Sequence, residues 1–308
     1  MQFIRLVILF ALSSLPIAGF LADAQAPGSR HARVELVSDR AVAVPGETVW
    51  MGLAFEIDPN WHIYWKNAGD AGIPPDIIWS QTGHVSADDI GTFSWPVPEL
   101  LPVVPGEIMD YGYSDQVVLP FPVTIPAEGD GAILFEGVAD YLICEDICIP
   151  ERADIRLLLS VGSAQIPDER GAALINAALE TVPTDFAGDA RLTAQGGAWV
   201  LSLAGDEVAG SRGEARFFPD GHDIVHAADQ PVRYGAKGLQ LMLTPTKPDD
   251  EVATLSGVVT LGDRAVRVAA VPGAVLEGTQ ATRKVNLVML IILAFIGGLI
   301  LNLMPCVL

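Results

Sequence analysis

Residues 141–150 read YLICEDICIP, and this stretch places two cysteines, Cys144 and Cys148, four positions apart. A run of apolar and β-branched residues precedes it at 132–139, and a second such run follows at 153–161. Short runs of this kind, separated by turn residues, predict β-strands. The cysteine pair is therefore expected where a strand ends in a turn.

The same pattern extends in both directions along the chain. Short apolar runs alternate with turns rich in proline, glycine, aspartate and asparagine, which is typical of an antiparallel β-sandwich. Before the cysteines, further strands are expected at 33–37, 48–57, 77–80 and 116–125. After them, strands are expected at 199–203, 214–218, 238–243, 253–261 and 264–270.

The pattern changes between these two strand-rich regions. Pro167 is a good first helical residue, Asp168 and Glu169 suit the positive end of a helix dipole, and apolar residues then recur near the helical period. The predicted fold is mainly β, with two immunoglobulin-like β-sandwich domains joined by a helix and followed by a transmembrane helix. The expected boundaries are 25–163 for the first sandwich, 164–184 for the linker helix and 185–280 for the second sandwich.

Both ends of the sequence carry apolar segments. Residues 1–24 have one early positive charge, an apolar run and a final Ala-Asp-Ala, which is the order of a secretory signal peptide. An uncleaved membrane anchor is the alternative. Residues 285–308 are long enough to span a bilayer, so they are expected to be the first transmembrane helix of a truncated membrane domain, or else a simple C-terminal anchor. The region between these segments is expected outside the cytosol, where disulfides persist.

The charge balance excludes one class of partner. The 308 residues include 18 Lys and Arg against 38 Asp and Glu, which gives a formal net charge of −20. Because a surface this negative repels phosphate backbones, we expect no nucleic-acid partner. The three cysteines are too few for a disulfide scaffold and have to be interpreted one by one.

The cysteine pair favours redox chemistry over a structural role. A disulfide across this spacing would close a loop of about five residues, which the chain-entropy model values at only ~2 kcal/mol. Glu145 and Asp146 lie between the two sulfurs, and their negative charge should disfavour thiolates and favour the oxidised form. The pair is therefore expected to act as a reductant. A small local disulfide with a structural role remains the alternative.

Two aromatic segments are candidates for a shield over the disulfide. Residues 61–70 form an aromatic-rich segment that is expected to be a turn, and residues 111–113 are expected in another loop. The aromatic side chains that these segments offer are Trp61, Tyr64, Trp65, Tyr111 and Tyr113. Ordinary packing in the sandwich core is the alternative, because aromatic residues dominate such cores.

Two metal-binding hypotheses arise from the sequence. His222 and His226 have the spacing that places two imidazoles on one helical face, but no zinc-protease glutamate accompanies them and turn residues precede them, so no metal site is expected there. Soft sulfur ligands are also present in the cysteine pair and in Met51 and Met109. Because such ligands suit Cu(I), a copper-binding module is the main rival to the redox interpretation, although no cofactor beyond the cysteines is expected.

Three segments of the sequence together resemble a known protein family. The segment 144–150, the aromatic segment 61–70 and the sequence NLMPCVL at 302–308 together resemble the DsbD/ScsB group of membrane thiol:disulfide interchange proteins, and more narrowly the ScsB-type branch. The resemblance implies a periplasmic region anchored in a bacterial inner membrane and associated with copper tolerance. One departure is that typical periplasmic domains of the family space their cysteines more widely.

The resemblance also implies roles. Electrons from cytoplasmic thioredoxin would cross the membrane through the remaining membrane domain, in which Cys306 matches the first cysteine. They would then reach Cys144 and Cys148, which would reduce a periplasmic thioredoxin-fold oxidoreductase. By this analogy Cys148 enters the mixed disulfide and Cys144 resolves it. The partner of Cys306 and the family's C-terminal thioredoxin-like domain are absent from the 308 residues, so this chain is not expected to complete the relay alone.

Overall fold

The structure is a computed structural model of the chain, and it describes residues 30–128, 131–248, 253–280 and 291–298. The predicted signal peptide at 1–24 and the predicted relay cysteine Cys306 lie outside the described residues. The predicted membrane helix at 285–308 is described only at 291–298, which are helical. No helix in the described part of the chain is both long and apolar enough to cross a membrane.

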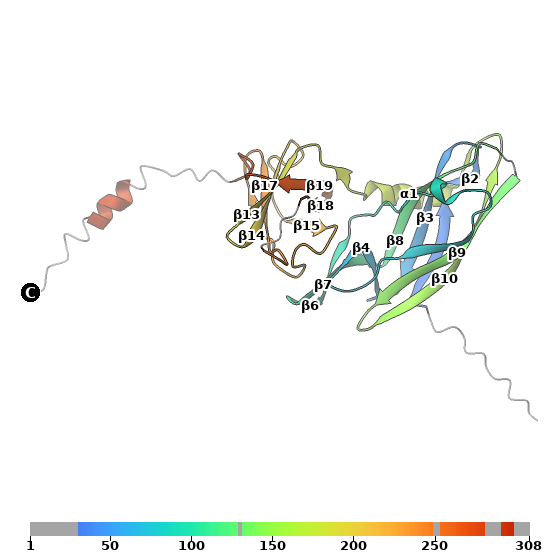
Figure 1. The fold of residues 1–308 in the computed structure, drawn as a ribbon, viewed down its shortest axis with the longest axis horizontal. Coiled ribbons are helices and arrows are strands. Elements are labelled where there is room, and N and C mark those ends of the chain that lie inside the picture. Colours follow the sequence, from blue (N-terminus) through green and yellow to red (C-terminus); the bar gives the residue numbers. More distant parts are fainter. Residues whose placement is uncertain (1–29, 129–130, 249–252, 281–290, 299–308) are drawn as a thin grey trace, which may run out of the picture. The chain divides into compact units, whose positions relative to one another are not determined.

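The first sandwich begins with a three-stranded antiparallel sheet in the order β1-β3-β8 (Figure 1). Leu36, Leu53 and Leu119 lie opposite one another across the three strands and are buried, as the period-two alternation of a half-buried sheet requires. The bounds are Ala32–Ser38 for β1, Thr48–Ile57 for β3 and Gln116–Thr124 for β8.

The second sheet of this sandwich has the order β11-β2-β10-β9-β4-β7-β6, with β5 also paired to β9. Side chains from both sheets contribute to one hydrophobic core. The bounds are Arg40–Ala43 for β2, His62–Gly69 for β4, Asp76–Gln81 for β5, Glu99–Val104 for β6, Ile108–Ser114 for β7, Gly131–Cys144 for β9, Cys148–Val161 for β10 and Ile166–Pro167 for β11. A short 3-10 helix, Ala87–Asp89, lies between β5 and β6.

Strands β9 and β10 form the longest antiparallel pair, in register from Gly131 opposite Val161 to Cys144 opposite Cys148. Alternate residues of β9, including Phe135 and Tyr141, are buried in the core, which is the pattern expected for a strand with one buried face. The two cysteines therefore end a hairpin, as the sequence predicted.

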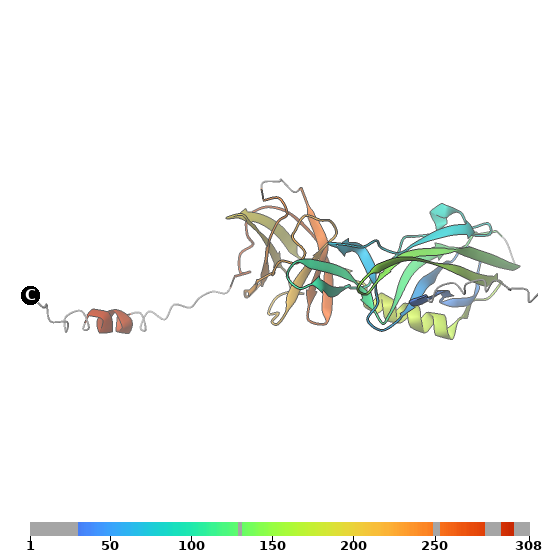
Figure 2. The ribbon, with the colours of Figure 1, turned by 90° about the horizontal axis from the view of Figure 1, so that it is seen from below.

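Helix α1, Glu169–Glu180, packs on the outer face of the three-stranded sheet (Figure 2). Ile175 is fully buried there against Val37 and Ala54. The prediction that Pro167 is the first helical residue is wrong, because Pro167 belongs to β11. Asp168 is the N-cap instead, and its carboxylate accepts a hydrogen bond of 2.7 Å from the Gly171 N–H.

The second sandwich contains an eight-stranded arrangement in the order β15-β18-β19-β13-β14-β17-β16, with β12 paired to β19. It has its own buried core, which includes Trp199, Phe217 and Leu241. The bounds are Thr184–Asp185 for β12, Asp189–Gln195 for β13, Ala198–Ala204 for β14, Ala215–Pro219 for β15, Val232–Tyr234 for β16, Gly238–Leu243 for β17, Leu255–Leu261 for β18 and Arg264–Pro272 for β19.

The mainly β fold with sandwich-like sheets is confirmed, but two local predictions are wrong. The segment 61–70, predicted as a turn, contains β4, and the segment 111–113, predicted as a loop, lies within β7. Their aromatic residues suit strands, since large side chains pack well on a pleated surface. These two strands pair with each other, and β4 meets the end of β9 where His62 lies opposite Cys144.

Candidate redox site

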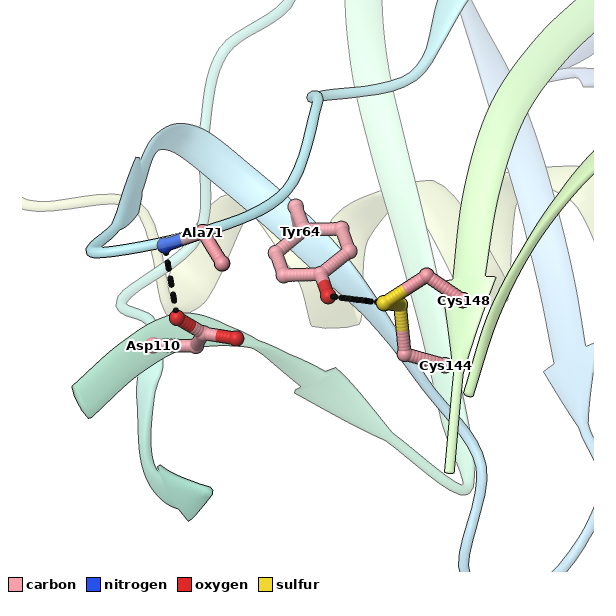
Figure 3. Close-up of a disulfide and its surroundings, with 5 residues drawn as sticks. All are labelled: Tyr64, Ala71, Asp110, Cys144 and Cys148. Carbon is pink, nitrogen blue, oxygen red and sulfur yellow. Dashed lines mark hydrogen bonds between the residues drawn. A yellow bond between two sulfur atoms is a disulfide. The ribbon is translucent and has the colours of Figure 1, made fainter. Parts of the chain in front are cut away.

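The described structure contains a disulfide between Cys144 and Cys148, whose Cα atoms are 4.1 Å apart (Figure 3). The two cysteines differ in their surroundings, because Cys144 is only 2% exposed whereas Cys148 is exposed. The three residues between them, Glu145, Asp146 and Ile147, are all exposed at the hairpin tip. A protein that approached this disulfide from solvent would therefore meet Cys148 and the hairpin tip first.

Tyr64 of β4 covers the buried side of the disulfide. Its hydroxyl donates a hydrogen bond of 2.7 Å to Cys144 Sγ and lies 3.5 Å from Cys148 Sγ (Figure 3). The Tyr64 ring is fully buried in a small cluster with Ala68 and Cys144, against which Leu142 packs. Burial raises the pKa of the Tyr64 hydroxyl well above its usual value, so the hydroxyl keeps its proton at neutral pH.

Gly72 lets the loop after β4 lie against the Tyr64 ring. Gly72 has a φ of +103°, and a Cβ atom there would come within 2.2 Å of the ring. Only glycine combines this backbone conformation with such a close approach. The loop is therefore packed directly against the Tyr64 ring.

Asp110 of β7 is a buried carboxyl group beside this cluster. It is 1% exposed, and it accepts a hydrogen bond of 3.0 Å from the Ala71 N–H of the same loop (Figure 3). Burial, with a further contribution from the nearby charge of Asp70, raises the pKa of Asp110 to about 6. The Ala71 N–H and the Tyr64 hydroxyl partly oppose that rise in the Asp110 pKa.

His62 packs against Tyr64, with their rings edge to face at a centroid distance of 5.3 Å. Its Nε2 atom is buried and has no hydrogen-bond partner among the described residues, and burial lowers the pKa of its imidazole. His62 is therefore a neutral group next to the site at neutral pH.

The other four predicted shielding residues lie elsewhere. Trp61 stacks on His31 with ring centroids 3.7 Å apart, and Trp65 lies in the sandwich core. The Tyr113 hydroxyl donates to the Pro96 carbonyl at 2.8 Å, and the Tyr111 hydroxyl lies 3.1 Å from His226 Nδ1. These four side chains take part in packing contacts of the sandwich, and a shielding role for them stays a prediction.

Residues 215–226 of the second sandwich contact the strands that carry the site. The Asn67 side-chain amide donates to the Pro219 and Gly221 carbonyls at 2.8 and 2.9 Å, and Lys66 forms an ion pair of 2.7 Å with Asp220. Phe218 packs edge to face on Tyr111, with ring centroids 5.0 Å apart. The second sandwich thereby contacts β4 and β7, which hold Tyr64 and Asp110.

The residues of the metal-binding hypotheses are not grouped around the sulfurs. His222 Nδ1 lies 3.2 Å from His226 Nε2, and the other ring nitrogen of His226 contacts the Tyr111 hydroxyl. Met51 and Met109 belong to the sandwich core, whereas Cys144 belongs to the separate cluster with Tyr64. In the part of the chain that the structure describes, no group of three or more His, Cys, Asp and Glu side chains could hold a metal ion.

Sequence reasoning did not single out Asp110, Gly72 or His62. The signal for Asp110 was a carboxylate among the apolar and aromatic residues of 108–113, where a strand would bury it. Gly72 and His62 were harder to recognise from sequence. Their proximity to the disulfide depends on the pairing of β4 with β9, and these strands are far apart in sequence.

Replacing Gly72 should uncover the disulfide. The Gly72→Ala change should displace the Tyr64 ring, destabilise the protein by roughly 1–3 kcal/mol and speed reduction of the disulfide by dithiothreitol. Gly106→Ala is a matched control, because Gly106 also has a positive φ, +79°, but has nothing within 4 Å of the added Cβ. Equal reduction rates in the two variants would show that the Gly72 contact does not protect the disulfide.

Replacing Asp110 should stabilise the oxidised protein near neutral pH. A raised carboxyl pKa means that the native state gains stability from protonation below about pH 4 and loses it as the pH rises through about 6. Asp110→Asn should therefore raise the free energy of unfolding by roughly 1–3 kcal/mol at pH 7.5, at about 1.36 kcal/mol per pKa unit, and by much less at pH 4.5.

Urea unfolding at both pH values measures this difference. The exposed Asp154→Asn is the control and should change the free energy of unfolding little at either pH. A variant that lost equal stability at both pH values would show that the Asp110 carboxylate is well accommodated when charged.

Comparison with known proteins supports the resemblance found in the sequence. Residues 33–160 match the sequence model of the family described as thiol:disulfide interchange protein DsbD, N-terminal. Among solved structures, the chain is similar to the N-terminal periplasmic domain of ScsB from Proteus mirabilis, with a TM-score of 0.61 and 22% identity over 80% of this chain and 96% of that chain. No curated protein matches the chain in sequence.

A structure of titin domains Z1Z2 with telethonin also aligns, at 10% identity over 80% of this chain and 98% of that chain. Its TM-score of 0.19 is too low to indicate a common fold. The ScsB similarity shows a common fold, and the DsbD match covers the sandwich that bears both cysteines. Residues 33–160, which include both cysteines, therefore match a DsbD N-terminal domain, and the fold of the chain is similar to that of the ScsB periplasmic domain.

Proposed function

We propose that this chain is the periplasmic exchange module of a membrane electron-transfer protein, and that it acts as a protein-disulfide reductase through Cys144 and Cys148. One observation carries the proposal: the disulfide joins a buried cysteine beneath Tyr64 to an exposed cysteine at a hairpin tip. The match to a DsbD N-terminal domain supports it, because that family is described by thiol:disulfide interchange.

The different exposure of the two cysteines assigns their roles in this proposal. In the reduced chain the exposed Cys148 thiolate attacks a disulfide of the client and forms a mixed disulfide. The buried Cys144 then attacks Cys148 Sγ, which closes the intramolecular disulfide and releases the reduced client. Because Cys144 is covered by Tyr64, it is protected from reaction with other disulfides.

A thioredoxin-fold oxidoreductase of the periplasm is the proposed client. The exposed Ile147 next to Cys148 offers an apolar contact, and Glu145 and Asp146 offer charged contacts, at the point where a client has to approach. The periplasmic location, the inner-membrane anchor, the supply of electrons through Cys306 and the link to copper tolerance are parts of the same proposal. No bound cofactor is part of this mechanism.

Serine variants of the two cysteines test the proposal. The pre-reduced chain, mixed with an oxidised thioredoxin-fold protein and followed by gel shift of alkylated thiols, should transfer one pair of electrons per molecule and then stop. Cys148→Ser should abolish transfer because the attacking sulfur is gone. Cys144→Ser should accumulate the mixed disulfide because the resolving sulfur is gone. Transfer at the wild-type level by both variants would contradict the proposal.

The exposed carboxylates at the hairpin tip should tune the reduction potential. Glu145→Gln with Asp146→Asn removes negative charge near the sulfurs, which should stabilise the thiolates and make the pair more oxidising. Since both residues are exposed and their charges are screened, we expect a shift below about 30 mV, which corresponds to ~1.4 kcal/mol.

Equilibration with glutathione buffers at low and high salt measures this potential. The shift should shrink at high salt if it arises from charge. Glu136→Gln on β9, which pairs with Arg156, serves as the control far along the hairpin and should leave the potential unchanged. An unchanged or lower potential in the double variant would show that these two carboxylates do not act on the sulfurs.

A further inference from the structure

Asp110 is a buried carboxyl group with no part in the attack by Cys148 or the resolution by Cys144 as proposed above. It lies on β7 opposite the apolar Leu101 of β6. The Ala71 N–H satisfies one oxygen at 3.0 Å. The Tyr64 hydroxyl, which is hydrogen-bonded to Cys144, lies between the Asp110 carboxyl group and the sulfurs (Figure 3).

The exchange reaction requires a proton acceptor at Cys144. A thiol must lose its proton before it attacks, because the thiolate is the nucleophile. Cys148 is exposed and can give its proton to water, but Cys144 is buried beneath Tyr64, where water has poor access. The second step of exchange, in which Cys144 attacks Cys148, therefore depends on a proton acceptor inside the protein.

We propose that Asp110 takes up the Cys144 proton during this second step, and returns it during the reverse reaction, through the Tyr64 hydroxyl. The Cys144 thiol gives its proton to the Tyr64 oxygen while the Tyr64 hydroxyl gives its own proton to an Asp110 oxygen. The Cys144 thiolate forms a bond to Cys148 Sγ, the bond between Cys148 and the client sulfur breaks, and the client leaves as a thiolate. This inference rests on the proposed function.

The charges around Asp110 suit a group that exchanges a proton near neutral pH. Asp70 in the adjacent loop opposes ionisation of Asp110, and the Asp70 carboxylate is itself fixed by the Met109 N–H at 2.8 Å. On β4 the titratable groups are Tyr64, the neutral His62 that packs on it, and Lys66, which forms an ion pair with Asp220. On the side of the second sandwich, His226 and Arg216 act on Tyr111 rather than on Asp110.

The two chemical steps can be followed separately with glutathione disulfide as the oxidant. The reduced full chain is mixed with excess glutathione disulfide, quenched by acid at successive times, and analysed by mass spectrometry between pH 5 and 9. Attack by Cys148 appears as a glutathione adduct, and attack by Cys144 appears as loss of that adduct with formation of the intramolecular disulfide.

Asp110→Asn should leave adduct formation within about twofold of wild type and slow adduct resolution roughly 10–10²-fold at pH 7, in the range of positioned proton transfer. The difference should vanish near pH 9, because hydroxide then ionises the Cys144 thiol directly. Tyr64→Phe should reproduce this pH profile, and the double variant should be no slower than either single one. Asp154→Asn, at an exposed site on β10, should behave as wild type.

Two contrary outcomes are distinguishable. Failure of the wild-type chain to form the Cys148 adduct would overturn the proposed function itself. Formation and resolution of the adduct by Asp110→Asn with the wild-type rate and pH profile would overturn the inference about Asp110 alone. A slowing of resolution that is equal at every pH would also overturn it, because that result is the signature of altered packing and not of a lost proton acceptor.

Discussion

The antiparallel register of β9 and β10 is the constraint on which the site depends. It places Cys144 opposite Cys148 at the end of the hairpin, so that the disulfide forms between strand ends whose positions the sandwich core fixes. Because side chains alternate along a strand, a shift of one residue would turn the sulfurs to the other face of the sheet. The pairing of His62 with Cys144 then brings β4, and with it Tyr64, next to the buried sulfur.

The surroundings of the disulfide favour protection over stability. Gly72 adopts a left-handed conformation, His62 has a buried nitrogen without a hydrogen-bond partner among the described residues, and Asp110 carries a carboxyl group in the sheet interior. The unpartnered His62 nitrogen and the buried Asp110 carboxyl group each cost folding free energy, whereas glycine adopts the Gly72 conformation without strain. Their concentration within one small cluster around Tyr64 and Cys144 is the pattern expected of a reactive site and not of a simple structural disulfide.

The sequence predicted the strands with regular alternation well, and β3 lies at the predicted residues 48–57. It also located the cysteine pair at the end of a strand and included Tyr64 among five aromatic candidates without selecting it. The strands β4 and β7 were missed because their polar and glycine residues, such as Asn67 and Gly112, are typical of turns. Asn67 is accommodated by hydrogen bonds to residues 219 and 221, a long-range contact that no local pattern could indicate.

The choice of Tyr64 over Trp65 or Tyr111 likewise depended on strand pairing. Neighbouring residues of a strand point to opposite faces, so Tyr64 covers the cysteine while Trp65 enters the core beside Phe218. Asp110 could be recognised only after β7 was known to be a strand next to β4. The cysteine pair and the aromatic candidates were thus visible in the sequence. Recognising Tyr64 and Asp110 as the residues beside the disulfide required the order of the strands in the sheet.

The fold gives the two sulfurs unequal access to solvent, and alkylation of the reduced chain measures this difference. The chain would be reduced, exposed briefly to limiting iodoacetamide and digested, and the modification of each cysteine would be quantified by mass spectrometry. We expect Cys148 to be modified well before Cys144, and Tyr64→Ala to remove most of this difference. Equal modification of the two cysteines in the wild-type chain, or faster modification of Cys144, would show that the fold does not protect Cys144.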